Sequence, residues 1–351
     1  MRLRHSTITR PLAANARTAL LLAAVLGASC LFEPVDLGEH GEFAAEFDLA
    51  WQTVDRTFPG FLFTPVDWDE TYRNCSPFVD TVTTQMGLVE LLASMTAPLE
   101  DATIRFMSPG GGILVQPFVP QIEPNFDMDV LWDYLEPAGF SWFQYDAWGA
   151  CMFDSVPYVM IQSWSPGMSL TSLDDFLDAH PGAVAVIIDI RMNGGAGSGQ
   201  RIAEIGRRFN DQTRVGYFSV GRDGPEWDDL CDPVPRLVHS RADWCQVPLV
   251  VLVGENCGWV SEEFACIASE LPLAVLMGDT TQGQCSDCKA YELAGSWTMW
   301  LPDSTILQSD TVTWVQGRGI PPDIFVDATE EQFSQGIDPV LEYALDWAQS
   351  Q

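Results

Sequence analysis

The feature that most constrains the fold is an alternation of short apolar runs with amphipathic segments in the second half of the chain. Three runs that are rich in β-branched residues and bounded by proline or glycine have the length of buried strands: 156–164, 183–190 and 247–254. Two further segments, 199–209 and 261–271, repeat their apolar residues with helical spacing. Strands that alternate with helices predict an α/β core with a largely parallel sheet.

A smaller helical segment precedes this core. In residues 45–106 apolar residues such as Leu88 and Leu92 recur on one helical face, which predicts a small helical domain. Residues 107–150 are rich in glycine, proline and aromatic residues, as is typical of irregular chain with short strands. We therefore predict a helical domain, a connecting segment and an α/β core over 151–351.

The N-terminus has the composition of a secretory signal. Residues 1–29 contain four arginines, no acidic residue and an apolar run that is too short to span a bilayer. Small residues lead up to Cys30, which resembles the lipidated cysteine of bacterial lipoprotein signals. The alternative is ordinary signal-peptidase cleavage nearby. In both cases we expect the mature chain outside the cytoplasm; in the first, a lipid anchor at Cys30 and a tether over 30–44 hold it at a membrane of the periplasm or cell surface.

Cysteine usage agrees with an exported protein. The chain has nine cysteines, so an even number remains after Cys30, which favours disulfides. A metal site would rest on Cys285 and Cys288, but their zinc-like spacing has no second pair and no nearby histidine. We therefore expect neither a metal nor another cofactor.

The charge of the chain restricts its partners. The formal net charge is -32, and such an acidic surface repels the phosphate backbone of nucleic acids. Nucleic-acid binding is thereby excluded, whereas cationic peptides or a high-salt setting suit this charge.

Four segments carry strand, turn and helix motifs in a recognisable order. They are IIDIRMNGGAGSG (187–199), VVLVGENCGWVSEEFACIA (250–268), LMGDTTQGQ (276–284) and GRGIPPDIFVD (317–327). They resemble the tail-specific proteases, also called C-terminal processing peptidases, and residues 47–61 and 66–80 are similar to the helical domain of the lipoprotein branch of that family. The resemblance implies a spiral core like that of ClpP and the crotonases, without a PDZ insert.

The resemblance also locates the catalytic positions, beginning with the nucleophile. If Glu262 matches the glutamate of the family's serine segment, the nucleophile's position three residues earlier holds Trp259. An indole cannot attack a carbonyl. A large aromatic side chain at a strand end is usually packing, and here it would fill the volume in which a scissile bond should lie.

The positions of the other catalytic groups are changed as well. The segment LEDAT (99–103) matches the motif that ends in the family's histidine, which places Thr103 there. The family's lysine position matches Gln284, and its glutamate position matches Gln316. Hydroxyl and amide groups do not exchange protons near neutral pH, so none of the three can act as a general base.

Parts that need no titratable group are retained. The turn at Gly194 and Gly195, together with Val260 after the nucleophile's position, can present backbone N–H groups to an oxyanion or a peptide carboxylate. The alternative is that these glycines serve only the geometry of a strand-to-helix turn.

An active enzyme would need a rearranged dyad. Ser261 lies two residues after Trp259, and Lys289 is the only lysine of the chain and follows the family's lysine position by five residues. Against this, Ser261 also suits a helix N-terminus. His239 as a base matches no family motif, and an acyl-CoA enzyme of the crotonase type is disfavoured because an exported protein would not meet CoA.

The sequence thus predicts an exported relative of serine peptidases that has lost catalysis and binds a peptide or protein segment in the former substrate cleft. The alternative is an active serine endopeptidase that uses Ser261 and Lys289.

Overall fold

The largest element of the fold is a seven-stranded sheet built around the strands that the sequence predicts. The computed structural model describes residues 42–112, 114–144 and 147–351. The strand order is β13-β10-β9-β6-β5-β4-β3. Neighbours from β13 to β5 pair in parallel, and β4 and β3 continue the sheet antiparallel. The strands are β3 (Ser141–Gln144), β4 (Trp148–Phe153), β5 (Val156–Ile161), β6 (Val186–Asp189), β9 (Leu249–Val253), β10 (Ala274–Gly278) and β13 (Ile324–Phe325). The predicted α/β class is confirmed.

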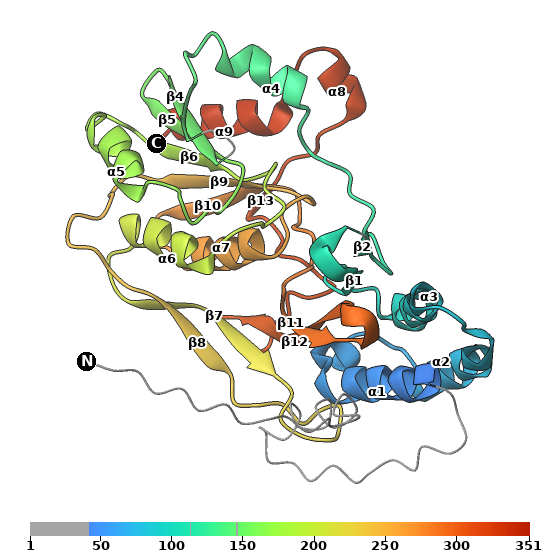
Figure 1. The fold of residues 1–351 in the computed structure, drawn as a ribbon. Coiled ribbons are helices and arrows are strands. Elements are labelled where there is room, and N and C mark those ends of the chain that lie inside the picture. The colour runs from blue at the N-terminus through green and yellow to red at the C-terminus, as the bar shows by residue number, and fades with distance from the viewer. Residues whose placement is uncertain (1–41, 113, 145–146) are drawn as a thin grey trace, which may run out of the picture. The chain divides into compact units, whose positions relative to one another are not determined.

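Helices cover both faces of this sheet. Every residue of β6 and β9 is buried, which explains their continuous apolar sequences. Figure 1 shows α4 and α9 above the sheet and α6 and α7 below it. The helices of this part are α4 (Met128–Leu135), α5 (Leu170–Asp178), α6 (Gly199–Arg208), α7 (Val260–Ser269), α8 (Glu330–Ser334) and α9 (Pro339–Gln349).

A second, antiparallel sheet lies beyond α6 and α7, and the sequence did not reveal it. Its order is β2-β1-β12-β7-β8, and β11 also pairs with β12. Its strands are β1 (Arg105–Met107), β2 (Leu114–Val115), β7 (Arg214–Gly221), β8 (Val234–Val238), β11 (Ser286–Glu292) and β12 (Thr298–Gln308). β12 connects the two halves of the sheet, because Arg105 of β1 pairs with Trp300 and Phe218 of β7 pairs with Leu307.

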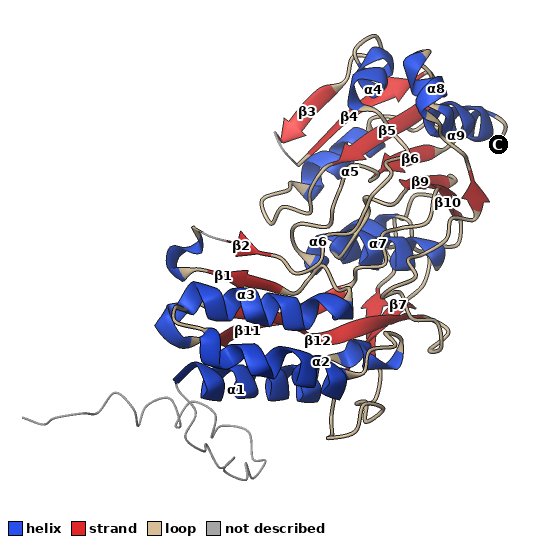
Figure 2. Ribbon diagram, turned by 90° about the vertical axis from the view of Figure 1, so that its right-hand side faces the viewer, coloured by secondary structure: helices blue, strands red, loops and turns tan. Residues whose placement is uncertain are grey.

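The N-terminal helices pack on this second sheet (Figure 2). They are α1 (Glu42–Thr57), α2 (Trp68–Cys75) and α3 (Gln85–Thr96), joined by the 3₁₀ turns η1 (Pro59–Leu62) and η2 (Ser76–Thr81); η3 (Ala97–Leu99), η4 (Pro109–Gly111) and η5 (Ala294–Ser296) follow later. Phe47, Trp68 and Leu92 share one hydrophobic cluster with Met299 and Leu301 of β12. The helical segment therefore completes its core with a strand from the far end of the chain.

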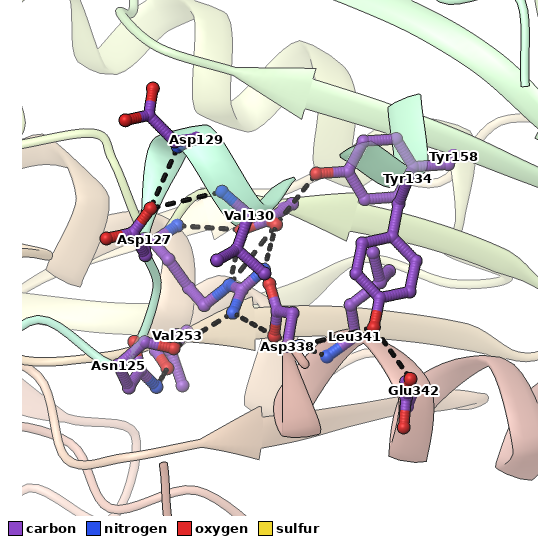
Figure 3. A network of polar contacts seen from close by, with 12 residues as sticks. Asn125, Asp127, Asp129, Val130, Tyr134, Tyr158, Val253, Asp338, Leu341 and Glu342 are labelled. Atoms are coloured by element: carbon purple, nitrogen blue, oxygen red, sulfur yellow. Dashed lines mark hydrogen bonds and ion pairs between the residues drawn. The ribbon is translucent and has the colours of Figure 1, made fainter. Parts of the chain in front are cut away.

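A buried ionic network fixes the chain directly after β6. Arg191 is fully buried, and its Nη2 lies 2.7 Å from Asp189 Oδ2 and 2.9 Å from Asp338 Oδ2. Its Nη1 donates to the carbonyl of Asn125 at 3.0 Å, and Tyr158 donates to Asp189 at 2.8 Å (Figure 3). The two carboxylates hold the pKa of the guanidinium above its usual value, although burial alone would lower it. Removing one partner would leave a buried charge uncompensated, so the network is intolerant of change.

The expectation of disulfides is wrong for the cysteines that the structure describes. All eight are free thiols: Cys75, Cys151, Cys231, Cys245, Cys257, Cys266, Cys285 and Cys288. Half of them are buried as small apolar side chains in hydrophobic clusters, where they pack and need no partner. The even number of cysteines therefore did not indicate pairing here.

The predicted signal over 1–29, Cys30 and most of the tether over 30–44 lie outside the described residues. Within the part of the chain that is described, no helix combines the length and apolarity required to cross a bilayer.

Candidate functional site

Trp259 stands at a sharp turn between β9 and α7. Its backbone has φ 46° and ψ -119°, in a region where non-glycine residues are strained, and it is the first residue before the helix. Its N–H donates to the carbonyl of Gln284 at 2.9 Å. A turn of this kind lifts one side chain out of the strand-to-helix connection. The position that the family resemblance assigns to the nucleophile is thus a strained turn residue that carries an indole.

The glycine turn after β6 packs directly against Trp259. Gly195 has φ +89°, and a Cβ atom there would lie 2.0 Å from the carbonyl oxygen of Gly258, so only glycine fits. Its N–H is already used, since it donates to Asn193 Oδ1 at 3.0 Å. By contrast, the N–H groups of Gly194 and Val260 donate to no other residue that the structure describes. Of the three residues proposed for binding an oxyanion, these two retain a free donor.

The indole of Trp259 contacts a cation. The Cζ atom of Arg105 lies 5.3 Å from the centroid of Trp259 and 4.9 Å from that of Trp300. Cation–π contacts of this kind hold a guanidinium between two rings. The Trp259 side chain is thereby held towards β1 and β12.

Glu262 anchors the turn that carries Gln284. Its carboxylate is fully buried and accepts hydrogen bonds from Gly283 N at 2.6 Å, from Gln284 N at 2.8 Å and from the hydroxyl of Thr281. Burial raises its pKa to about 7, against the effect of these donors. Glu262 therefore positions the neighbouring turn and does not face a substrate.

The three positions matched to the family's histidine, lysine and glutamate lie together around a buried carboxylate. Gln316 Nε2 donates to Asp101 Oδ2 at 2.9 Å and to Gln284 Oε1 at 3.3 Å. Thr103 donates to Asp101 Oδ1 through its backbone N–H at 2.8 Å and also through its hydroxyl. Gln284 Oε1 also accepts from Ala102 N at 2.8 Å. The chain thus brings these residues to one place, where the Thr103 hydroxyl bonds to Asp101 and the two glutamine amides bond to each other.

Asp101 is the titratable group that the sequence interpretation passed over. It is 2% exposed, and burial raises its pKa to about 6. Within the described residues no ion pair reaches it. The only signal for its role was its place in the segment LEDAT, where it precedes the matched histidine position by two residues.

A pocket opens beside this network. Its volume is about 330 Å³. Polar residues of its lining include Asp101, Gln284 and Gln316, and aromatic residues include Phe63 and Phe118. The full lining is Phe58, Phe63, Thr64, Pro65, Leu99, Glu100, Asp101, Phe118, Pro120, Gln121, Gln282, Gln284, Gln316 and Gly317. The aromatic walls were not expected from the sequence, because they come from loops distant in the chain.

The alternative dyad of Ser261 and Lys289 has no geometric support. Ser261 is fully buried; its hydroxyl donates to Asn193 O at 2.8 Å and accepts from Trp164 Nε1 at 2.9 Å. Lys289 lies on the exposed face of β11 with its ammonium 5.8 Å from the ring centroid of Tyr291. A serine that is closed off from solvent and satisfied on both sides cannot attack a substrate.

The remaining candidates do not join the site. His239 Nδ1 lies 3.5 Å from the hydroxyl of Thr213, next to β8. The thiol of Cys285 points to the carbonyl of Trp259, and that of Cys288 to the carbonyl of Thr103. Among the described residues no cluster of histidine, cysteine and acidic side chains could hold a metal ion.

Comparisons with known proteins identify one peptidase family. Residues 155–326 match the sequence model of Peptidase family S41, and residues 39–97 match that of the Tricorn protease C1 domain. No curated protein sequence matches the chain.

Several solved structures share the fold. A proposed peptidase from Parabacteroides merdae ATCC 43184 is 23% identical, covers 88% of this chain and 97% of its own, and superposes with a TM-score of 0.79. The mature protein CPAF in complex with lactacystin is 9% identical over 87% of this chain and 97% of its own, with a TM-score of 0.61. The photosystem II D1 C-terminal processing protease is 13% identical, covers 82% of this chain and 94% of its own, and superposes with a TM-score of 0.51.

The fold and the order of the motifs therefore define a protein of the C-terminal processing peptidase class. The chain belongs to Peptidase family S41, with an N-terminal region similar to the tricorn C1 domain.

Proposed function

We propose that this chain is an exported, lipid-anchored S41 family protein that has lost peptidase activity and binds a peptide or protein segment in the former substrate cleft. The observation that carries the proposal is Trp259, which has a strained backbone at the position that the family resemblance assigns to the nucleophile and carries an indole there. Without a nucleophile at this turn, acyl transfer cannot begin.

The surroundings of Trp259 support the loss of catalysis. Thr103, Gln284 and Gln316 are bonded to each other or to Asp101 and offer no general base next to the turn. The serine nearest in sequence, Ser261, is buried and fully hydrogen bonded. Loss of one group is compatible with a rearranged enzyme, whereas replacement of all of them favours a binding role.

Peptide binding is supported by what the cleft still offers. The N–H groups of Gly194 and Val260 flank Trp259 and are free to receive a backbone carbonyl or carboxylate. The pocket beside Asp101 adds room for a side chain. A scaffold that keeps donors and a pocket after losing its reactive groups is suited to hold a segment without cutting it.

Export and lipidation rest on the N-terminal sequence. The four arginines, the apolar run and Cys30 follow the order of a lipoprotein signal. A lipoprotein from Streptococcus agalactiae, 11% identical over 92% of this chain and 99% of its own, has the same fold with a TM-score of 0.56. Lipidation at Cys30 would place the binding cleft at a membrane surface.

The decisive test of lost catalysis is treatment of the purified protein with a serine-directed fluorophosphonate and with β-casein. We expect no adduct on any serine and no cleavage, with trypsin as the positive control. Saturable labelling of one serine, abolished by its substitution with alanine, would restore the peptidase hypothesis.

Lipidation is tested in a bacterial host fed with labelled palmitate. We expect label on the wild-type chain and none on Cys30→Ser, with Cys75→Ser as the matched control. An unlabelled wild-type chain that partitions into the aqueous phase of a detergent separation would contradict the anchor.

A further inference from the structure

The pocket beside the former base positions has a one-sided charge. Among the described residues that line it, Glu100 and Asp101 are acidic and none is lysine, arginine or histidine. Asp101 is buried there without an ion pair from any residue in the described ranges. A buried carboxylate is costly unless it is hydrogen bonded or meets a cation.

The carboxylate of Asp101 has acceptor capacity left. Oδ1 accepts two hydrogen bonds from Thr103, and Oδ2 accepts one from Gln316 Nε2. An ionised carboxylate accepts about four hydrogen bonds. One position on Oδ2 therefore remains for a donor that enters from the pocket.

The walls of the pocket suit the stem and the head of a basic side chain. Phe58, Phe63 and Phe118 line it together with Pro65 and Pro120. Aromatic faces attract ammonium and guanidinium groups, and apolar walls pack along their aliphatic stems. The pocket volume of about 330 Å³ is at the lower end of the range for ligand pockets. It can accommodate one side chain but not a folded segment.

We propose that this pocket is a specificity site that receives one lysine or arginine side chain of the bound peptide, with its charged group against Asp101. The inference rests on the proposed function, because it names the class of peptide that the cleft holds. The net charge of -32 attracts such peptides from solution, and the pocket then selects the residue.

The test uses octapeptide pools with one fixed central residue and uncharged degenerate positions elsewhere. The fixed residue is lysine or its neutral analogue norleucine, or arginine or its neutral analogue citrulline. Binding to the purified full chain is measured by fluorescence anisotropy. We expect the lysine and arginine pools to bind about tenfold more tightly than their neutral partners.

Two variants connect the preference to the pocket. Asp101→Asn should abolish the preference and leave the neutral pools within about twofold, whereas Asp80→Asn, an exposed change of the same charge, should leave the preference intact. Phe118→Leu is a second test in case Asp101→Asn does not fold. It keeps an apolar side chain at a half-buried position of the pocket wall. It should reduce the preference about threefold.

The outcomes separate this inference from the proposed function. Equal binding of charged and neutral pools, or a preference that survives Asp101→Asn in folded protein, overturns the basic-residue pocket while peptide binding stands. Absence of binding by every pool overturns peptide binding itself. If free cadaverine displaces the lysine pool with an inhibition constant equal to the dissociation constant of that pool, the ligand is a small amine and not a peptide side chain.

Discussion

The side-chain amide of Gln316 donates a hydrogen bond of 2.9 Å to the carboxylate of Asp101, although 215 positions separate the two residues in the chain. The same glutamine accepts from Cys285 N at 2.7 Å through Oε1. Gln316 therefore links the end of the helical segment to the start of β11. An amide can make both bonds because it carries a donor and an acceptor, whereas an ionised carboxylate has only acceptors.

The first prediction concerns Gln316→Glu, which puts the family's residue in this place. At pH 8 it sets a second carboxylate against Asp101 and removes the donor, so we expect a loss of about 2–4 kcal/mol in the free energy of unfolding. At pH 5 protonation of one carboxyl should reduce the loss. Urea unfolding at both pH values is the measurement, with the exposed change Gln200→Glu as the control. An equal loss at both pH values would contradict charge repulsion as the cause.

The second prediction separates the backbone of Trp259 from its indole. Trp259→Gly and Trp259→Ala both remove the ring and its contact with Arg105, so they differ mainly in the cost of φ 46°. Glycine adopts this region without strain, and we expect the glycine variant to be more stable by about 1 kcal/mol. The measurement is the thermal unfolding midpoint of the two variants, which we expect to be higher for the glycine variant. If alanine is the more stable, the turn is not strained at this residue.

The third prediction is that a nucleophile alone does not restore catalysis. Trp259→Ser places a hydroxyl on the turn, but its neighbours Thr103, Gln284 and Gln316 hold no base to activate it. We expect casein hydrolysis and fluorophosphonate labelling to stay at the wild-type background. Trp259→Ala is the matched control. Hydrolysis by the serine variant alone would mean that another group, such as Asp101, acts as the base.

The fourth prediction assigns Ser261 to packing. Ser261→Ala removes the bond to Asn193 O and leaves Trp164 Nε1 without an acceptor in a fully buried place. We expect a loss of about 1–3 kcal/mol in the free energy of unfolding and no change in peptide binding. Ser334→Ala, which removes an exposed hydroxyl, should change stability by less than about 0.5 kcal/mol. Equal stability of both variants would contradict the burial of Ser261.

The sequence predicted the parallel strands and the helices that follow them because each is a local apolar pattern. It did not reveal the second sheet, since that sheet depends on pairing between distant segments, such as Arg105 with Trp300. β11 begins within residues 285–288, whose polar and cysteine-rich sequence CSDC gave no strand pattern. Short strands that are paired through remote partners leave little trace in a single sequence.

For the site, the sequence identified positions but not their contacts. The family resemblance assigned Thr103, Gln284 and Gln316 to the positions of catalytic groups, but it did not give their hydrogen bonds to Asp101 and to each other. Asp101 was missed because its meaning depends on its burial and on the pocket, which is lined by five separate segments of the chain. Burial of an acidic residue is a property of the packed fold, and no local spacing encodes it.

The fifth prediction is that stability falls as the pH rises from 4 to 8. Burial raises the pKa of Asp101 to about 6 and those of Glu262 and Glu263 to about 7. A raised pKa means that the folded chain binds the proton more tightly than the unfolded chain. The stabilisation is complete below the unfolded pKa values near 4 and is lost as the pH passes 6 to 7. Since one pKa unit corresponds to about 1.4 kcal/mol, we expect a decrease of several kcal/mol.

Repulsion among the many surface acids changes stability in the same direction, so a variant must isolate the buried groups. Glu262→Gln removes one of the three carboxyls whose pKa is raised to about 6 or 7, and the pH slope of the unfolding free energy between 5 and 7 should fall by about a third. The exposed change Glu330→Gln, which alters net charge equally, should leave the slope unchanged. If both variants flatten the curve alike, surface repulsion and not burial causes the pH dependence, and the protonated form of these carboxyls contributes nothing to folding.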